Sequence, residues 1–238
     1  MSKRGSGISG KDKEIIKIDD SSALCHPVTP QPALATMQSW ARIDLRIGRI
    51  LTAEVFAKAR KPAYKLSVDF GGLGTRQSSA QLTFAYPDPA VLVGQPVVAV
   101  VNFPARRIAG FESQVLVTGF YADEKRVFLL QPSKEDCRPG TRVSLVGVPE
   151  EEPSSSEATI DDFVACKIYC GTVIESNGDE ATVDCGEAGR LSCTATTGPL
   201  TIGTIVVLTI VDGRGRLLVA GDALLTTQST VPNGTILA

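Results

Sequence analysis

The sequence predicts an all-β protein made of two tandem five-stranded barrels, the second a degenerate copy of the first, after a disordered N-terminal tail. Short β-rich segments are separated by Gly and Pro turns, with no long amphipathic helix between them, and the same order of signals returns in the second half. This pattern favours small closed barrels over an alternating parallel α/β sheet. A hydrophobic content of 43% excludes a collagen-like or wholly disordered chain.

Two breaks divide the chain into domains. Residues 1–36 mix Gly, Ser, Pro and charges without apolar periodicity, which predicts the disordered tail. Residues 149–157, with the sequence PEEEPSSSE, combine like charges with serines that bury no core, which predicts a linker. We therefore expect a first domain at residues 37–148 and a second at residues 158–238.

The β-rich segments of the first domain are short. They are Asp44–Val55, Tyr64–Phe70, Val97–Asn102, Gln114–Tyr121 and Arg126–Leu130. Five strands of this length are enough to close one small barrel.

The second domain repeats the first in outline, and chance matching of Gly and Val positions is the alternative. The matched pairs, in chain order, are Gly48 with Gly171, residues 68–71 with 183–186, Arg76 and Ser78 with Arg190 and Ser192, Gly94 with Gly203, VLVTG at 115–119 with LLVAG at 217–221, and RPGT at 138–141 with PNGT at 232–235. The second copy keeps the strands and shortens the loops at 56–64 and 104–113. Because loops carry function on a rigid scaffold, we expect the second copy to have a structural role.

Charge is divided unequally between the two halves. Residues 37–146 carry a net charge of +6, with 15 Lys/Arg against nine Asp/Glu, whereas residues 147–238 carry −9, with four against 13. A basic module favours an anionic partner, and two ordinary solvated surfaces are the alternative.

The composition also argues against catalytic and metal sites. With His26 as the one histidine, a histidine-based catalytic triad or a histidine-ligated metal is hard to build, and no phosphate loop or nucleophile elbow occurs. We expect no enzyme, no cofactor and no metal. A zinc site at Cys166, Cys170, Cys185 and Cys193 is the weaker alternative to core packing, because their spacing lacks paired knuckles. No apolar run is long enough to span a bilayer, so we expect a cytoplasmic protein without membrane contact.

Three segments of the basic copy carry the candidate binding residues. Lys58, Arg60, Lys61, Arg106 and Arg107 can contact phosphates, whereas Ser78, Ser79, Gln81, Asn102 and Ser113 can hydrogen-bond base edges or 2′-hydroxyls. Phe103, with Tyr64 and Phe111, could stack on an unpaired base if exposed. The alternative is that the aromatic residues belong to the core and the arginines are merely solvated.

The strings DLRIGRI, ARKPAYKLSVDFG, RQSSAQ and VVAVVNFPARRIAGFESQVLVTGF closely resemble the CsaA-type export-related chaperones of the tRNA-binding-domain family, which also includes the endothelial monocyte-activating polypeptide-type modules. The resemblance spans residues 40–144. It implies an OB-fold barrel that binds tRNA through backbone shape and charge, and it places Arg76, Ser78, Ser79, Gln81, Asn102, Arg106, Arg107 and Ser113 on the family's surface-loop motifs.

The resemblance also implies a set of partners. We expect a non-catalytic tRNA-binding protein, with a chaperone for extended polypeptide or an accessory docking subunit of an aminoacyl-tRNA synthetase as alternatives. CsaA proteins are homodimers, and the acidic second copy departs from them. We expect it to pack on the first copy as a pseudo-dimer partner, which makes the chain a monomer, with a retained homodimer as the alternative.

Overall fold

The computed structural model describes residues 37–150, 157–195, 198–211, 213–228 and 230–238. The expected tail at residues 1–36 lies outside these ranges, as does most of the expected linker. A helical turn at residues 37–40 opens the described chain. Within these ranges, every helix is too short or too polar to cross a bilayer.

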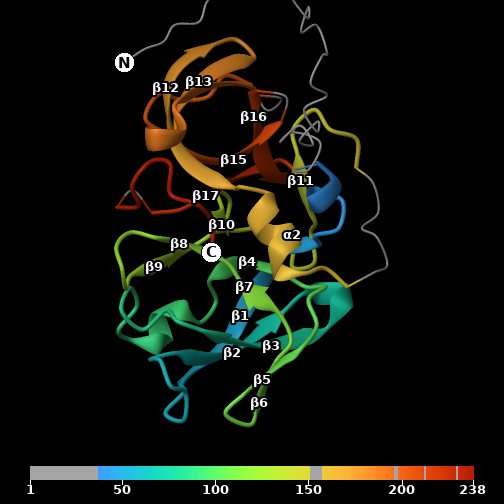
Figure 1. Cartoon of the computed structure of the whole chain (residues 1–238), viewed down its shortest axis with the longest axis vertical. Helices are drawn as coiled ribbons and strands as arrows, with labels where there is room; N and C mark the ends of the chain where they lie inside the picture. The colour runs from blue at the N-terminus through green and yellow to red at the C-terminus, as the bar shows by residue number, and fades with distance from the viewer. Residues whose placement is uncertain (1–36, 151–156, 196–197, 212, 229) are drawn as a thin grey trace, which may run out of the picture.

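The first barrel is built on an antiparallel sheet of order β3-β2-β1-β4-β7, accompanied by two small hairpins (Figure 1). Its strands are β1 (Leu45–Val55), β2 (Tyr64–Asp69), β3 (Thr75–Ala80), β4 (Pro96–Val100), β5 (Arg106–Ile108), β6 (Phe111–Ser113), β7 (Leu116–Val117), β8 (Gly119–Tyr121) and β9 (Val127–Leu129), with the 3-10 helices η1 (Gly71–Leu73) and η2 (Pro89–Leu92). The predicted segments omit β3, because its polar sequence TRQSSA shows no apolar alternation.

The second barrel uses strands from both halves of the chain. Its own elements are α2 (Ile160–Ala165), β12 (Tyr169–Asn177), β13 (Glu180–Asp184), η3 (Gly186–Ala188), β14 (Arg190–Thr194), β15 (Ile205–Val211), β16 (Arg214–Ala220) and β17 (Ala223–Thr226). From the first half, β10 (Gln131–Pro132) pairs with β17 and β11 (Val143–Leu145) pairs with β16. The predicted class, all-β with two five-stranded barrels, is confirmed.

The two barrels repeat one another in detail. In each, a glycine of the first strand packs under a valine of the second, so that an added Cβ would lie 2.5 Å from Val68 at Gly48 and 2.6 Å from Val183 at Gly171. The first strand of each barrel also shifts register two residues further on, after Ile50 in β1 and after Val173 in β12. These bulges increase the local twist that closing a barrel requires.

The matched RPGT and PNGT segments close equivalent turns. The amide of Gly140 donates to the carbonyl of Ile47, and the amide of Gly234 donates to the carbonyl of Cys170. Both glycines have positive φ, +89° and +82°, which a residue with a side chain adopts only at a cost. The glycine of each motif is therefore the residue that the turn requires.

The predicted match of Arg76 with Arg190 is wrong by one residue. The pairing of β2 with β3 sets Thr75 opposite Asp69, and the pairing of β13 with β14 sets Arg190 opposite Asp184. Arg190 therefore corresponds to Thr75 rather than to Arg76, and the buried Ser78 corresponds to the buried Cys193. A one-residue shift changes the face on which a strand side chain lies, so the shared letters R-x-S do not mark a shared surface.

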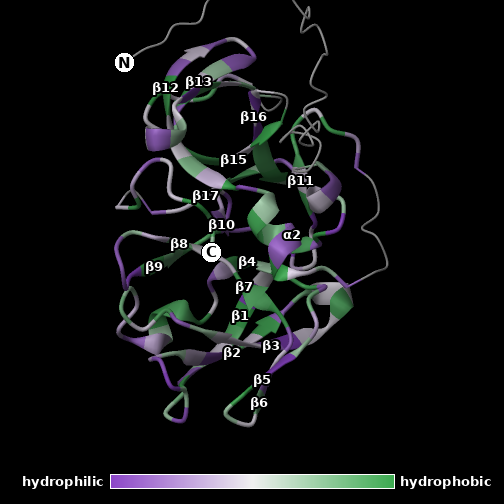
Figure 2. Ribbon diagram, in the orientation of Figure 1, coloured by the Kyte–Doolittle hydropathy of each residue, from purple (hydrophilic) through white to green (hydrophobic). Residues whose placement is uncertain are grey.

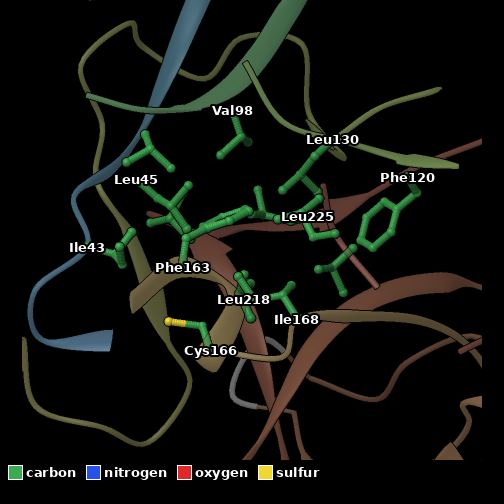
Figure 3. Packing of buried hydrophobic residues seen from close by; sticks show 14 of the residues in the cluster. Ile43, Leu45, Val98, Phe120, Leu130, Phe163, Cys166, Ile168, Leu218 and Leu225 are labelled. Carbon is green, nitrogen blue, oxygen red and sulfur yellow. The ribbon is translucent and has the colours of Figure 1, made fainter. Parts of the chain in front are cut away.

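A single apolar core joins the two barrels. The first half contributes Leu45, Val98, Phe120 and Leu130 among others, and the second half contributes Phe163, Ile168, Leu218 and Leu225 among others (Figure 3). Strands on either side of it, β1, β7 and β16, carry hydrophobic residues (Figure 2). Each barrel also has a separate core of its own.

Several polar contacts accompany this joint core. The amide of Gly119 and the carbonyl of the C-terminal Ala238 are 3.1 Å apart, with a reciprocal bond of 2.9 Å. The Nζ of Lys134 lies 2.5 Å from a carboxylate oxygen of Asp222, and Arg42 lies 3.6 Å from Asp162. The two barrels therefore form one packed unit.

Replacing Phe163 tests the contribution of the joint core to stability. Phe163 is 3% exposed, and Phe163→Ala should lower the free energy of unfolding by about 3–5 kcal/mol, because it removes a large buried side chain and leaves a cavity. The measurement is urea unfolding followed by circular dichroism. The control is Val164→Ala on the same helix, which is 61% exposed and should change stability by less than about 0.5 kcal/mol. Equal effects from the two variants would contradict the packing described.

Candidate nucleic-acid interface

Two loops project from the end of the first barrel that points away from the second, and both carry basic residues (Figure 1). One is the β1–β2 loop, residues 56–63, and the other is the β5–β6 hairpin. The exposed basic residues on them are Lys58, Arg60, Lys61, Arg106 and Arg107. Within the described ranges, none of the five has a carboxylate oxygen within 4.0 Å. The second barrel leaves this surface uncovered.

The β1–β2 loop is fixed at its base. The amide of Phe56 donates to the carbonyl of Ala63 at 2.9 Å, and the amide of Ala59 donates to the carbonyl of Phe56 at 3.0 Å. These bonds close the loop on itself. The basic side chains between them therefore project into solvent from a defined base.

The β5–β6 hairpin turns through Ala109 and Gly110, both of which have positive φ (+47° and +85°). Two such residues make the tight turn whose twist matches that of the flanking strands. In the hairpin register, Arg106 lies opposite Ser113 and Arg107 lies opposite Glu112. Glu112 is thus the nearest carboxylate along the ladder and reduces the local positive potential, although it forms no ion pair with Arg107 within 4.0 Å.

Three side chains connect the two projections. The rings of Phe56 and Phe111 meet edge to face, with centroids 5.5 Å apart and planes inclined by 62°. The Nζ of Lys65, on β2, lies 5.1 Å from the centroid of Phe56 and 5.5 Å from that of Phe111. We call these three residues the aromatic clasp. Phe111 is half-buried in it, so its ring is not free for a nucleobase on both faces.

Two serines expected to contact RNA instead close the barrel. The hydroxyl of Ser78 is buried and donates to the carbonyl of Val115 at 3.0 Å. The hydroxyl of Ser113 accepts from the amide of Ser79 at 3.1 Å. The Gln114 side chain accepts from the amide of Gln77 at 3.0 Å. Together, these three side chains join β3 to the end of the hairpin and the segment after it. Their polar atoms are engaged within the fold.

Asn102 and Phe103 are held by neighbouring segments. The Asn102 side chain accepts from the amide of Asp44 at 3.0 Å and donates to the carbonyl of Arg42 at 2.7 Å. The ring of Phe103 meets Phe163 edge to face at 6.3 Å. Both residues therefore position the chain at the junction with α2.

The remaining expected residues lie at or near the surface. Gln81 is exposed at the end of β3, whereas Arg76 and Ser79 are half-buried on that strand. The guanidinium Nε of Arg76 donates to the carbonyl of Leu73 at 3.4 Å. Tyr64, which sequence reasoning offered as a stacking residue, is 2% exposed, and its hydroxyl donates to the carbonyls of Tyr86 and Pro87. It belongs to the core.

The cysteines pack in apolar surroundings. Burial raises the pKa of the Cys166 and Cys185 thiols to about 12 and that of Cys193 to about 11, so these thiols are protonated at neutral pH. Among the described residues, no group of three or more His, Cys, Asp or Glu is placed to hold a metal ion. These three thiols therefore act as core side chains in this fold.

Comparison with known proteins assigns the first barrel to a family. Residues 45–142 match the family described as "Putative tRNA binding domain". The chaperone CsaA from Bacillus anthracis is 49% identical over 45% of this chain and 96% of its own, with a TM-score of 0.43. Through residues 45–142, the chain belongs to this tRNA-binding-domain family. CsaA from Picrophilus torridus is 38% identical over 45% of this chain and 97% of its own, with a TM-score of 0.42.

Longer relatives share only this module. The methionine–tRNA ligase of Methanococcoides burtonii is 36% identical over 108 residues, which are 45% of this chain and 15% of the ligase. That of Rhodopirellula baltica is 38% identical over 108 residues, 16% of its length. The chain thus spans about one-sixth of the length of the ligases it matches. The rest of each ligase has no counterpart in the matched region.

Replacing Ser78 tests its role in closing the barrel. Ser78→Ala should lower the free energy of unfolding by about 1–2 kcal/mol, because the buried carbonyl of Val115 loses its short hydroxyl donor. Denaturant unfolding measures the change. The control is Gln81→Ala, an exposed change at the end of the same strand, which should alter stability by less than about 0.5 kcal/mol. A Ser78→Ala variant as stable as the parent would contradict this assignment.

Proposed function

We propose that the chain binds tRNA, without catalysis, through the two basic projections of its first barrel. The observation that carries the proposal is the cluster formed by Lys58, Arg60, Lys61, Arg106 and Arg107, which are exposed and without a carboxylate partner among the described residues. Membership in a tRNA-binding-domain family supports the choice of polyanion. The ligase relatives support it too, since they share this module and are named for tRNA.

Binding on this surface depends mainly on charge. Lysine and arginine contact phosphates without reading bases, and they release counterions from the RNA when they bind. Ser79 on β3 and Gln81 just after this strand are the residues proposed to contact 2′-hydroxyls or base edges. The interface residues thus proposed are fewer than the sequence suggested, because Ser78, Asn102, Phe103 and Ser113 have partners inside the fold.

We propose that residues 158–238 replace the second subunit that a homodimer would supply, with residues 37–148 as the binding domain. The joint apolar core and the pairing of β10 and β11 with β17 and β16 support this arrangement. The acidic character of the second half supports a single RNA-binding surface per chain, because like charge repels a polyanion.

The alternative is a chaperone that holds extended polypeptide. The 49% identity to a CsaA chaperone favours it. A peptide held by apolar burial should stay bound at high salt, whereas tRNA should dissociate. Docking on an aminoacyl-tRNA synthetase is a third hypothesis, and it predicts that the full chain co-purifies with a synthetase.

Removing the hairpin arginines tests the proposed function. The double variant Arg106→Ala/Arg107→Ala should weaken tRNA binding about tenfold at low salt. It should also reduce the slope of log Kd against log salt by about 1–2, because each lost phosphate contact removes roughly 0.7–0.9. Filter binding of tRNA to the full chain over a salt series gives both values.

The control removes the same charge from the second barrel. Arg190→Ala/Arg214→Ala changes two exposed arginines there and should leave the slope unaltered. An unfolded polypeptide, measured in parallel at two salt concentrations, tests the chaperone alternative. If the hairpin variant binds tRNA with unchanged affinity and salt response, the proposed surface is wrong.

A further inference from the structure

The β5–β6 hairpin stands apart from the main sheet of the first barrel. Its two strands pair only with each other, whereas β1, β2, β3, β4 and β7 form one continuous ladder in the described structure. A hairpin of three-residue strands is marginal without other support. Something beyond the ladder must therefore set the direction in which Arg106 and Arg107 project.

Attachments at the base of the hairpin and nearer its turn supply this support. At the base of the hairpin, the Ser113 hydroxyl accepts from the amide of Ser79. Nearer the turn, the ring of Phe111 contacts the ring of Phe56, which is 4% exposed and anchored at the start of the β1–β2 loop. The second attachment is the one that connects the hairpin to the opposite basic projection.

Lys65 completes this second attachment. In the strand register it lies between Glu54 on β1 and Ser79 on β3, but it forms no ion pair within 4.0 Å among the described residues. Its ammonium group lies over both rings instead. A cation over an aromatic face is attracted by the ring, and a half-buried one more strongly than an exposed one. Lys65 therefore holds the two rings together while keeping its charge on the basic surface.

We propose that Phe56, Phe111 and Lys65 are positioning residues for RNA binding. They fix the hairpin relative to the β1–β2 loop, so that the arginines of one projection and the lysines of the other meet the RNA backbone as one preformed surface. Preorganisation of this kind improves affinity by reducing the ordering that binding must impose. The inference rests on the proposed function for its ligand, but its structural part stands on the contacts alone.

Phe111→Leu is the test, since it keeps an apolar side chain and removes the ring. Without the clasp, trypsin should cut the RNA-free chain after Arg106 or Arg107 several-fold faster, because the hairpin opens more often. Binding of tRNA to the full chain should weaken about three- to tenfold, and the salt slope should fall as for the loss of the hairpin arginines. Phe111→Tyr, which keeps the ring, should behave as the parent in both measurements.

The control is Phe84→Leu. Phe84 is 49% exposed and has Lys125 over its ring at 5.8 Å, so the same chemical change breaks a cation–ring contact elsewhere on the barrel. It should alter neither the hairpin cleavage nor the salt slope. Thermal unfolding of each variant separates a local opening from a loss of the fold.

A mutant cycle that combines Phe111→Leu with Arg106→Ala/Arg107→Ala tests whether the clasp affects RNA binding through the hairpin arginines. If the clasp positions the arginines, removing them from the Phe111→Leu chain should cost far less affinity than removing them from the parent. Additive losses, or a Phe111→Leu chain with parental cleavage and slope, would overturn the inference. A parent chain that binds no tRNA would overturn the proposed function, whereas the cleavage rates would still decide whether the clasp holds the hairpin.

Discussion

The apolar core between the barrels constrains the rest of the structure. Phe120 and Leu130 of the first half pack with Phe163, Ile168 and Leu225 of the second, so neither half presents this face to solvent. Burial of apolar area on this scale is the main favourable term in folding and association. Strands β10 and β11 reinforce it, because they leave the first barrel and pair with the second. The two halves are thereby fixed as a pair.

The joint core and the two basic projections lie at opposite ends of the first barrel (Figure 1). The face of the first barrel used by the joint core is unavailable to a ligand, and Phe163 of α2 packs against Phe103 beside it. The opposite end retains two basic projections with short local supports. The first barrel thus has one packed end and one basic end, so under the proposed function a polyanion approaches from the basic end, and the acidic second half disfavours the other directions.

Much of the fold could be predicted from the sequence, because it depends on local signals. At Gly48 and Gly171 a Cβ would clash with a valine of the next strand, and the glycines of the RPGT and PNGT turns have positive φ, so the recurrence of these glycines reveals the repeat. The polar strand β3 escaped prediction because its inward Ser78 satisfies its hydroxyl through a partner 37 positions away. Such a pairing follows from how the barrel closes, which no local pattern records.

The candidate site was predicted only in part, for the same reason. Exposed arginines and lysines in loops are recognisable from composition and position, and the structure places five of them on the two projections. Whether Ser113, Asn102 or Phe103 is free depends on contacts with β3, the N-terminal turn and α2. The clasp was missed although Phe56 and Lys65 flank the basic loop. Only the fold brings Phe111 against them.

The mass of the full chain in solution tests the central claim, that residues 158–238 occupy the face through which two first barrels would otherwise associate. Light scattering over a range of protein concentrations should return the mass of one chain, 25.1 kDa, at every dilution. A stable mass of two chains across the same range would contradict the account, because it would require a further interface that leaves the joint core intact.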